Sequence, residues 1–192
     1  MSHIERKTTY FEAAGRQNTE TLLRVVKEYA MEMGVKHSVV ASTTGETGVQ
    51  ASELLEGANL VVVTHSTGFA KPGVQELKEE NRKRILANGA KVLTATHALS
   101  GCERAIRKAF DTIEPLEIIA NALRLFGEGT KVCVEIILMA ADAGLIPVDE
   151  DVIAVAGSGG GVDTALLVRP SDSGRLFDLE IREVIAKPRS LK

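Results

Sequence analysis

The stretch Val39-Val40-Ala41-Ser42-Thr43-Thr44-Gly45-Glu46-Thr47-Gly48 decides the fold. A short apolar run gives way to hydroxyl side chains and glycines, and a helical pattern resumes at Val49. This order predicts a β-strand, a tight loop and the start of a helix. In a parallel sheet such a loop lies at the carboxyl end of its strand, where open α/β folds bind ligands.

The loop between this strand and the helix is a candidate anion site. The first N–H groups of a helix have no partner inside the helix, and they attract negative charge. Hydroxyl groups would add donors, and glycines would let the backbone turn sharply and come close to a ligand. The residues concerned are Ser42, Thr43, Thr44, Gly45, Thr47 and Gly48. Serine and threonine are also ordinary helix-capping residues, so a purely structural role stays open.

Composition predicts a single globular domain over residues 1–192, with 44% hydrophobic residues. The net charge of -3, from 23 basic and 26 acidic side chains, argues against nucleic acid and membrane partners. Cys102 and Cys133 lack the spacing of a metal site or a disulfide framework, which fits a reducing cytoplasm. The polar residues 1–9 do not resemble a signal peptide, and no apolar run approaches the ~18 residues of a membrane span. A cytoplasmic location is expected, and a homo-oligomer is left open.

Alternating apolar runs and helical patterns predict a three-layer α/β sandwich with a mostly parallel sheet. Parallel strands are expected at residues 39–41, 60–63, 92–95 and 152–156, after a short first strand at 8–11. An antiparallel extension begins at Thr164, and the alternation over residues 181–186 is typical of a closing edge strand. Helices are expected between these strands and on both faces of the sheet.

The segment over residues 131–144 is ambiguous from its composition. Residues 131–138 are rich in β-branched side chains, as strands are, whereas the alanines that follow and the terminal Gly144 favour a helix. Its length favours a buried helix. A central strand here would change both the strand order and the grouping of the strand ends.

Polar residues follow three further predicted strands, and the carboxyl ends of parallel strands share one edge of the sheet. We therefore expect a single pocket there. Its additional candidate residues are Thr64, His65, Ser66, Thr96, His97, Gly157, Ser158, Gly159 and Gly160. The glycine run lacks the order of a dinucleotide-binding fingerprint and is followed by a strand, so a simple turn between two strands stays an alternative.

Three ionisable residues are candidates for chemistry. His65 and His97 each follow the last threonine of a strand and could serve as donors or acid/base groups, although a structural histidine is the more common case. Glu135 lies among apolar residues, so it either faces solvent or finds a buried partner. Two histidines alone make a weak metal site, and no metal is expected.

These motifs resemble the C-terminal domain of pyruvate kinase, and more closely a family of stand-alone proteins built on that domain. The resemblance rests on residues 39–48, 59–64, 91–96 and 131–135 and covers nearly the whole chain. It implies that the loop from Ser42 to Thr47 binds a phosphate, as the corresponding loop of pyruvate kinase binds an allosteric sugar phosphate. The catalytic barrel has no counterpart in 192 residues, so pyruvate kinase activity is not expected.

Two functions follow as expectations. The first is a small-molecule binding protein that holds a phosphate-bearing ligand, and whether it is also an enzyme stays open. Flavin mononucleotide (FMN) is the preferred ligand, because the stand-alone family resembles flavin phosphate binders. The second is a regulatory or structural domain that binds a sugar phosphate, a nucleotide effector or a partner protein without catalysis. A titratable group beside the ligand would favour an enzyme, whereas an effector site needs only the phosphate loop.

Overall fold

The computed structural model describes residues 3–190, which form a seven-stranded sheet in the order β1-β7-β6-β5-β2-β3-β4. The strands are β1 (Thr9–Phe11), β2 (His37–Ala41), β3 (Asn59–Thr64), β4 (Lys91–Thr94), β5 (Val152–Ala156), β6 (Thr164–Arg169) and β7 (Glu180–Pro188). β2 pairs in parallel with β3 and β5, and β3 pairs in parallel with β4. β6 is antiparallel to both β5 and β7, which confirms the antiparallel extension predicted from Thr164.

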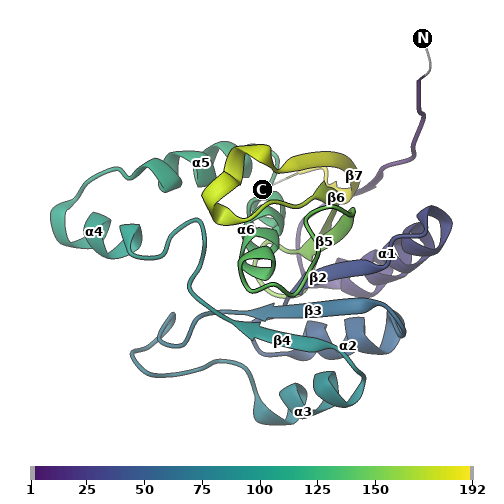
Figure 1. Ribbon diagram of the computed structural model, residues 1–192, viewed down its shortest axis with the longest axis horizontal. Coiled ribbons are helices and arrows are strands. Elements are labelled where there is room, and N and C mark those ends of the chain that lie inside the picture. Colours follow the sequence, from purple (N-terminus) through teal and green to yellow (C-terminus); the bar gives the residue numbers. More distant parts are fainter. Residues whose placement is uncertain (1–2, 191–192) are drawn as a thin grey trace.

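Helices cover both faces of this sheet (Figure 1). They are α1 (Thr19–Met33), α2 (Glu46–Leu54), α3 (Glu79–Ala87), α4 (Glu103–Phe110), α5 (Pro115–Arg124) and α6 (Glu128–Asp142), with the 3-10 turns η1 (Arg16–Asn18) and η2 (Ser173–Asp178). Alternate strand residues point to opposite faces: Val40 packs with α1, α2 and α3, whereas Val39 packs with α6. The three-layer α/β architecture is therefore as predicted. None of the helices within residues 3–190 is long and apolar enough to cross a membrane.

The path of the chain explains which helix lies on which face. From β2 the chain moves outward through β3 to the edge strand β4, with α2 and α3 as crossovers. It then returns to β5, on the other side of β2, through the segment that ends in α6. Since crossovers between parallel strands are right-handed, reversing the direction of travel places α6 on the opposite face. β2 and β5 are thus neighbours at the point where the strand order reverses, which is where open α/β sheets form a crevice.

The ambiguous segment 131–144 is helical, as its length predicted. α6 is the most buried helix of the described chain, with two buried runs, from Gly129 to Lys131 and from Cys133 to Ala140. It packs on β5 and β2 from one side and on α5 from the other. A helix covered on several sides needs apolar residues all round, which explains its strand-like composition.

The interpretation of residues 181–186 as an edge strand is wrong. β7 lies between β6 and β1, and β1 forms the edge. However, β1 pairs only with the end of β7, residues 186–188, so Glu180 to Arg182 stay exposed. The alternation in the sequence reflects the exposed half of β7. It gives no information on the pairing of β7 with β1, which lies more than 170 residues earlier in the chain.

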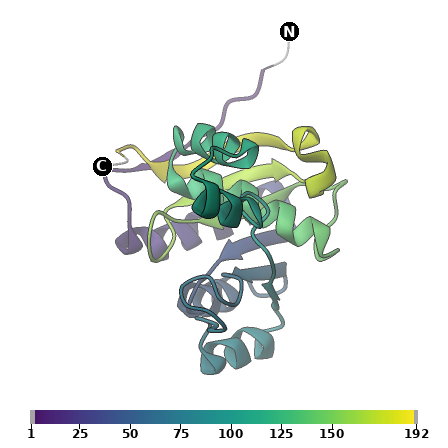
Figure 2. The same cartoon turned by 90° about the vertical axis from the view of Figure 1, so that its left-hand side faces the viewer.

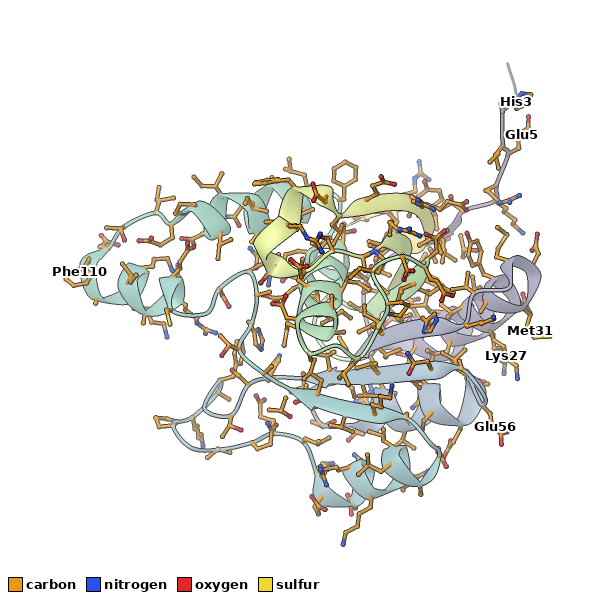
Figure 3. All side chains as sticks on the ribbon, in the orientation of Figure 1. His3, Glu5, Lys27, Met31, Glu56 and Phe110 are labelled. Carbon is orange, nitrogen blue, oxygen red and sulfur yellow. The ribbon has the colours of Figure 1, made fainter. Side chains whose placement is uncertain are left out.

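The helices α4 and α5 form an arm that extends from the body of the molecule (Figure 1) and comes toward the viewer in Figure 2. α4 contains no buried residue, and Phe110 at its end is 71% exposed (Figure 3). α5 packs on α6 through one face that includes Ala120. The arm is therefore anchored by α5, and α4 lies farther out.

Candidate functional site

A cleft of about 1200 Å³ lies at the carboxyl ends of β2, β3 and β5, and we call it the rim cleft. Its walls come from segments far apart in the sequence, including the starts of α2 and α6 and the turn after β5. Twelve of the fifteen candidate residues line it: Ser42, Thr43, Thr44, Thr47, Thr64, His65, His97, Glu135, Gly157, Ser158, Gly159 and Gly160. The strand ends therefore do meet in one pocket.

Three candidate residues do not line the rim cleft. Ser66 and Thr96 line a smaller hollow of about 270 Å³ next to it, which shares Phe69 and His97 with the rim cleft. Gly45 faces α3, because a Cβ atom at this position would lie 2.6 Å from Cβ of Asn81. The first two residues stay close to the site, and Gly45 shapes it only through packing.

The loop before α2 presents free donors to the cleft. Ser42 is buried, and its Oγ accepts the N–H of Gly48 at 3.0 Å, so this hydroxyl takes the capping role that the sequence left open. Within residues 3–190, the N–H groups of Glu46 and Thr47 have no hydrogen-bond acceptor, as is usual for a first helical turn. The hydroxyls of Thr44 and Thr47 likewise have no partner in the described part of the chain. These groups can bind an anion together with the positive end of α2.

The glycines of this loop have a packing role. Gly45 adopts φ +91°, a conformation that favours glycine, against the side chain of Asn81. At Gly48, a Cβ atom would lie 2.7 Å from Cγ1 of Val62 on β3. Each glycine therefore lets α2 approach a neighbouring element, and the close approach of this backbone to a ligand stays a prediction.

Two cations flank the one carboxylate at the start of α2. Glu46, the first residue of the helix, pairs with Arg16 at 3.0 Å and with Lys78 at 3.1 Å. The hydrogen bond from Lys78 holds the pKa of Glu46 below its usual value. Arg16 also lines the rim cleft, so an anion bound at this helix start would meet a guanidinium group beside the carboxylate.

A buried ionic cluster lines another part of the rim cleft. Glu135 is buried and accepts the Nζ of Lys131 at 2.5 Å and the N–H of Leu99 at 3.0 Å. His97 places Nδ1 3.7 Å from Oε2 of the same carboxylate. Glu135 has thus found the buried partner that one of its two sequence interpretations required.

Both ring nitrogens of His97 face other groups of the protein. Its Nε2 accepts the N–H of Ser66 at 3.3 Å, which places the proton of a neutral ring on Nδ1, facing Glu135. Burial lowers the pKa of His97, and the Glu135 carboxylate opposes this effect. The neutral ring is therefore favoured, with Nδ1 on the side of the carboxylate.

His65 belongs to the same rim. It contacts Glu76 through Nδ1 at 2.9 Å and Thr43 through Nε2 at 3.4 Å. Its ring lies 4.1 Å from that of Phe69, which stacks on His97 at 4.8 Å. The two histidines are thus held by one aromatic residue, Phe69, that the sequence did not single out.

The glycine turn after β5 is held by Asp163. This carboxylate is fully buried and accepts the N–H groups of Gly15 at 2.9 Å and Ser158 at 3.3 Å. It also accepts the hydroxyl of Thr164 at 2.9 Å. The turn therefore has a defined shape and is tied to the segment before α1.

Sequence reasoning missed Lys131 and Asp163. Lys131 stood in an apolar helical segment, where a lysine is as unexpected as Glu135 four residues later, and that i,i+4 pair was the available signal. An acidic residue two positions after a glycine run was the signal for Asp163. Across residues 3–190, no group of three or more His, Cys, Asp or Glu side chains is arranged to hold a metal ion.

Comparison with known proteins identifies one family. The family model described as "Pyruvate kinase, alpha/beta domain" matches residues 20–168. A crystal structure of a pyruvate kinase from Cryptosporidium parvum matches with 17% identity over 78% of this chain and 22% of that chain, at a TM-score of 0.39. A Cryptosporidium parvum pyruvate kinase in complex with ADP matches with 21% identity over the same shares of the two chains, at a TM-score of 0.37. The chain therefore spans about a fifth of the length of these pyruvate kinases.

Proposed function

Since the chain belongs to the pyruvate kinase alpha/beta domain family, we propose that it is a binding protein for a phosphate-bearing small molecule, held in the rim cleft. The observation that carries this proposal is the convergence of the polar strand ends on one cleft of about 1200 Å³. Protein sites for small molecules are concave, and they combine an apolar lining with a few directed polar groups. The phosphate lies at the start of α2, among the free donors of Thr44, Glu46 and Thr47.

FMN is the first ligand to test. The rim cleft is large enough for a nucleotide-sized molecule, since ligand sites of 300–1,000 Å³ are usual. Gly159 and Gly160 border it without side chains, and this supports the close approach of a flat ring to the backbone. The ionic cluster around Glu135 supplies polar groups for the edge of such a ring.

A regulatory domain that binds an effector without chemistry is the second candidate. One observation favours it: His97 has both nitrogens in internal contacts, so it is not free to accept a proton from a ligand. Transfer of phosphate to or from pyruvate is not part of either proposal.

The first experiment identifies the ligand. The purified protein is denatured, and the released material is examined by visible absorption and mass spectrometry. FMN, riboflavin and inorganic phosphate are then titrated calorimetrically into the ligand-free protein. We expect FMN to bind more tightly than riboflavin, because riboflavin lacks the phosphate.

Variants of the loop test the site itself. Thr47→Val keeps the side-chain shape and removes one donor, so it should weaken FMN binding about 10- to 150-fold, the equivalent of roughly 1.5–3 kcal/mol, and leave riboflavin unaffected. Thr112→Val, on an exposed loop between α4 and α5, is the matched control. Equal affinity of the wild type for FMN and riboflavin, unchanged in Thr47→Val, would mean that the loop is a structural turn. If FMN fails to bind, the affinities of the wild type and of Thr47→Val for inorganic phosphate still decide whether the phosphate site exists.

A further inference from the structure

Lys131 is an unusual residue for its place in the fold. Its side chain is only 8% exposed, and it stands at the fourth position of α6, near the positive end of the helix dipole. Both burial and the dipole disfavour a cation there. The pair with Glu135 also runs in the less favourable order along the helix, since a glutamate that precedes the lysine stabilises a helix better. Helix stability therefore does not account for this lysine.

The ammonium group has donors to spare. A lysine ammonium carries three N–H donors. Within residues 3–190, Glu135 is its one hydrogen-bond acceptor. Lys131 lines the rim cleft, so its remaining N–H groups are available to a molecule bound there. Each oxygen of Glu135, by contrast, already accepts one hydrogen bond, from Lys131 and from the N–H of Leu99.

The local charges indicate to what kind of atom Lys131 donates a further hydrogen bond. Glu135 already balances the charge of Lys131 at 2.5 Å. A second carboxylate would leave an excess negative charge in a buried place, which is costly. A neutral carbonyl oxygen needs no counter-charge and accepts a strong hydrogen bond from an ammonium group.

We propose that Lys131 is a ligand-binding residue of the rim cleft that donates to a carbonyl oxygen on the ring of the bound molecule. This inference rests on the proposed function and narrows it to phosphorylated heterocycles with a ring carbonyl. The start of α2 binds the phosphate, Lys131 binds the ring, and Glu135 and His97 are positioning residues that hold the ammonium in place.

The test must separate the ring from the phosphate. Lys131→Met alone leaves Glu135 buried without its cation, so the double variant Lys131→Met with Glu135→Gln keeps the site neutral and similar in volume. Lys27→Met, at an exposed lysine on α1 (Figure 3), is the matched control, and Lys131→Arg tests whether another cation rescues binding. Circular dichroism establishes that each variant is folded, and binding of FMN and riboflavin is followed by flavin fluorescence.

The double variant should lose about tenfold or more in affinity for FMN and for riboflavin alike, because both carry the same ring carbonyls. Thr47→Val should weaken the binding of FMN alone. The two variants therefore test the ring contact and the phosphate site independently, and either proposal can fail without the other. Unchanged affinity in the double variant refutes the role of Lys131. A loss confined to FMN refutes it as well, since Lys131 would then bind the phosphate.

If the wild type does not bind FMN, inosine and adenosine monophosphate replace it as probes, because they differ by a carbonyl and an amino group at one ring position. The wild type should prefer the inosine compound, and the double variant should lose this preference. Equal binding of the two nucleotides by the wild type, or no binding of either, overturns the proposal.

Discussion

Two substitutions of Asp163, to alanine and to asparagine, should show how much stability comes from its hydrogen bonds and how much from its charge. In the structure Oδ2 accepts the N–H groups of Gly15 and Ser158, and Oδ1 accepts the hydroxyls of Thr164 and Ser158. In Asp163→Ala both backbone N–H groups lose their acceptor. In Asp163→Asn the amide oxygen can take the place of Oδ2, while the amide NH₂ faces two hydroxyls that can rotate to accept from it.

The structure sets the expected magnitudes. An unsatisfied buried donor costs about 1–3 kcal/mol, so two such groups, each partly reachable by water, should make Asp163→Ala less stable by roughly 2–4 kcal/mol. Asp163→Asn keeps its hydrogen bonds and loses only their charge assistance, which should cost about 1 kcal/mol. The alanine variant should also bind FMN more weakly, because the turn at Gly159 loses its anchor.

Urea unfolding monitored by circular dichroism measures both effects, provided that the dependence of the unfolding free energy on urea stays the same. A difference of less than about 0.5 kcal/mol between the two variants would refute the assignment of these hydrogen bonds, since context alone produces variation of that size.

Three further changes have defined outcomes. Gly129→Ala should destabilise the protein by about 1–3 kcal/mol despite the better helix propensity of alanine, because its Cβ would lie 2.5 Å from Cβ of Thr164; a gain in the thermal midpoint would contradict this packing. Gly45→Ala should lower the free energy of unfolding of the ligand-free protein by roughly 1–3 kcal/mol, since φ is +91° and Asn81 occupies the space. A stability equal to that of the wild type would contradict this packing role. The pKa of His97 is lowered by burial, so the unfolded chain binds this proton more readily and wild-type stability falls as the pH drops below about 6.5. His97→Gln should show a smaller loss between pH 7.5 and pH 5 in urea unfolding, and an identical loss would mean that His97 does not cause it.

The sequence predicted the parts of the fold that depend on local pattern. Runs of apolar residues located β2, β3 and β5, and length identified α6 as a helix. The position of β7 could not be predicted, because β1, although expected as a strand, is remote in the sequence and too short to indicate which strand it pairs with. Strand order at that edge is set by long-range pairing, which single-sequence periodicity does not report.

For the candidate site, position was predictable and hydrogen bonding was not. Parallel strands bring their carboxyl ends to one edge, so the convergence of the loops followed from the element order alone. Which hydroxyl is free to bind a ligand depends on side-chain geometry. The hydroxyl of Ser42 accepts the N–H of Gly48, whereas that of Thr47 has no hydrogen-bond partner in the described residues. The buried partner of Glu135 was one helical turn away in the sequence, yet its burial depends on how α5 and η2 cover α6.

The exposed α4 has a consequence for hydrogen exchange. An eight-residue helix that buries none of its side chains opens at little free-energy cost, so its amide hydrogens should exchange within seconds. The amide hydrogens of β2 and β5 should exchange only when the whole protein unfolds. Arg104 and Arg107 of α4 also line the rim cleft. A ligand that contacts either guanidinium would restrict these openings, so slowed exchange in α4 alone would report an occupied cleft even for a ligand without colour or fluorescence.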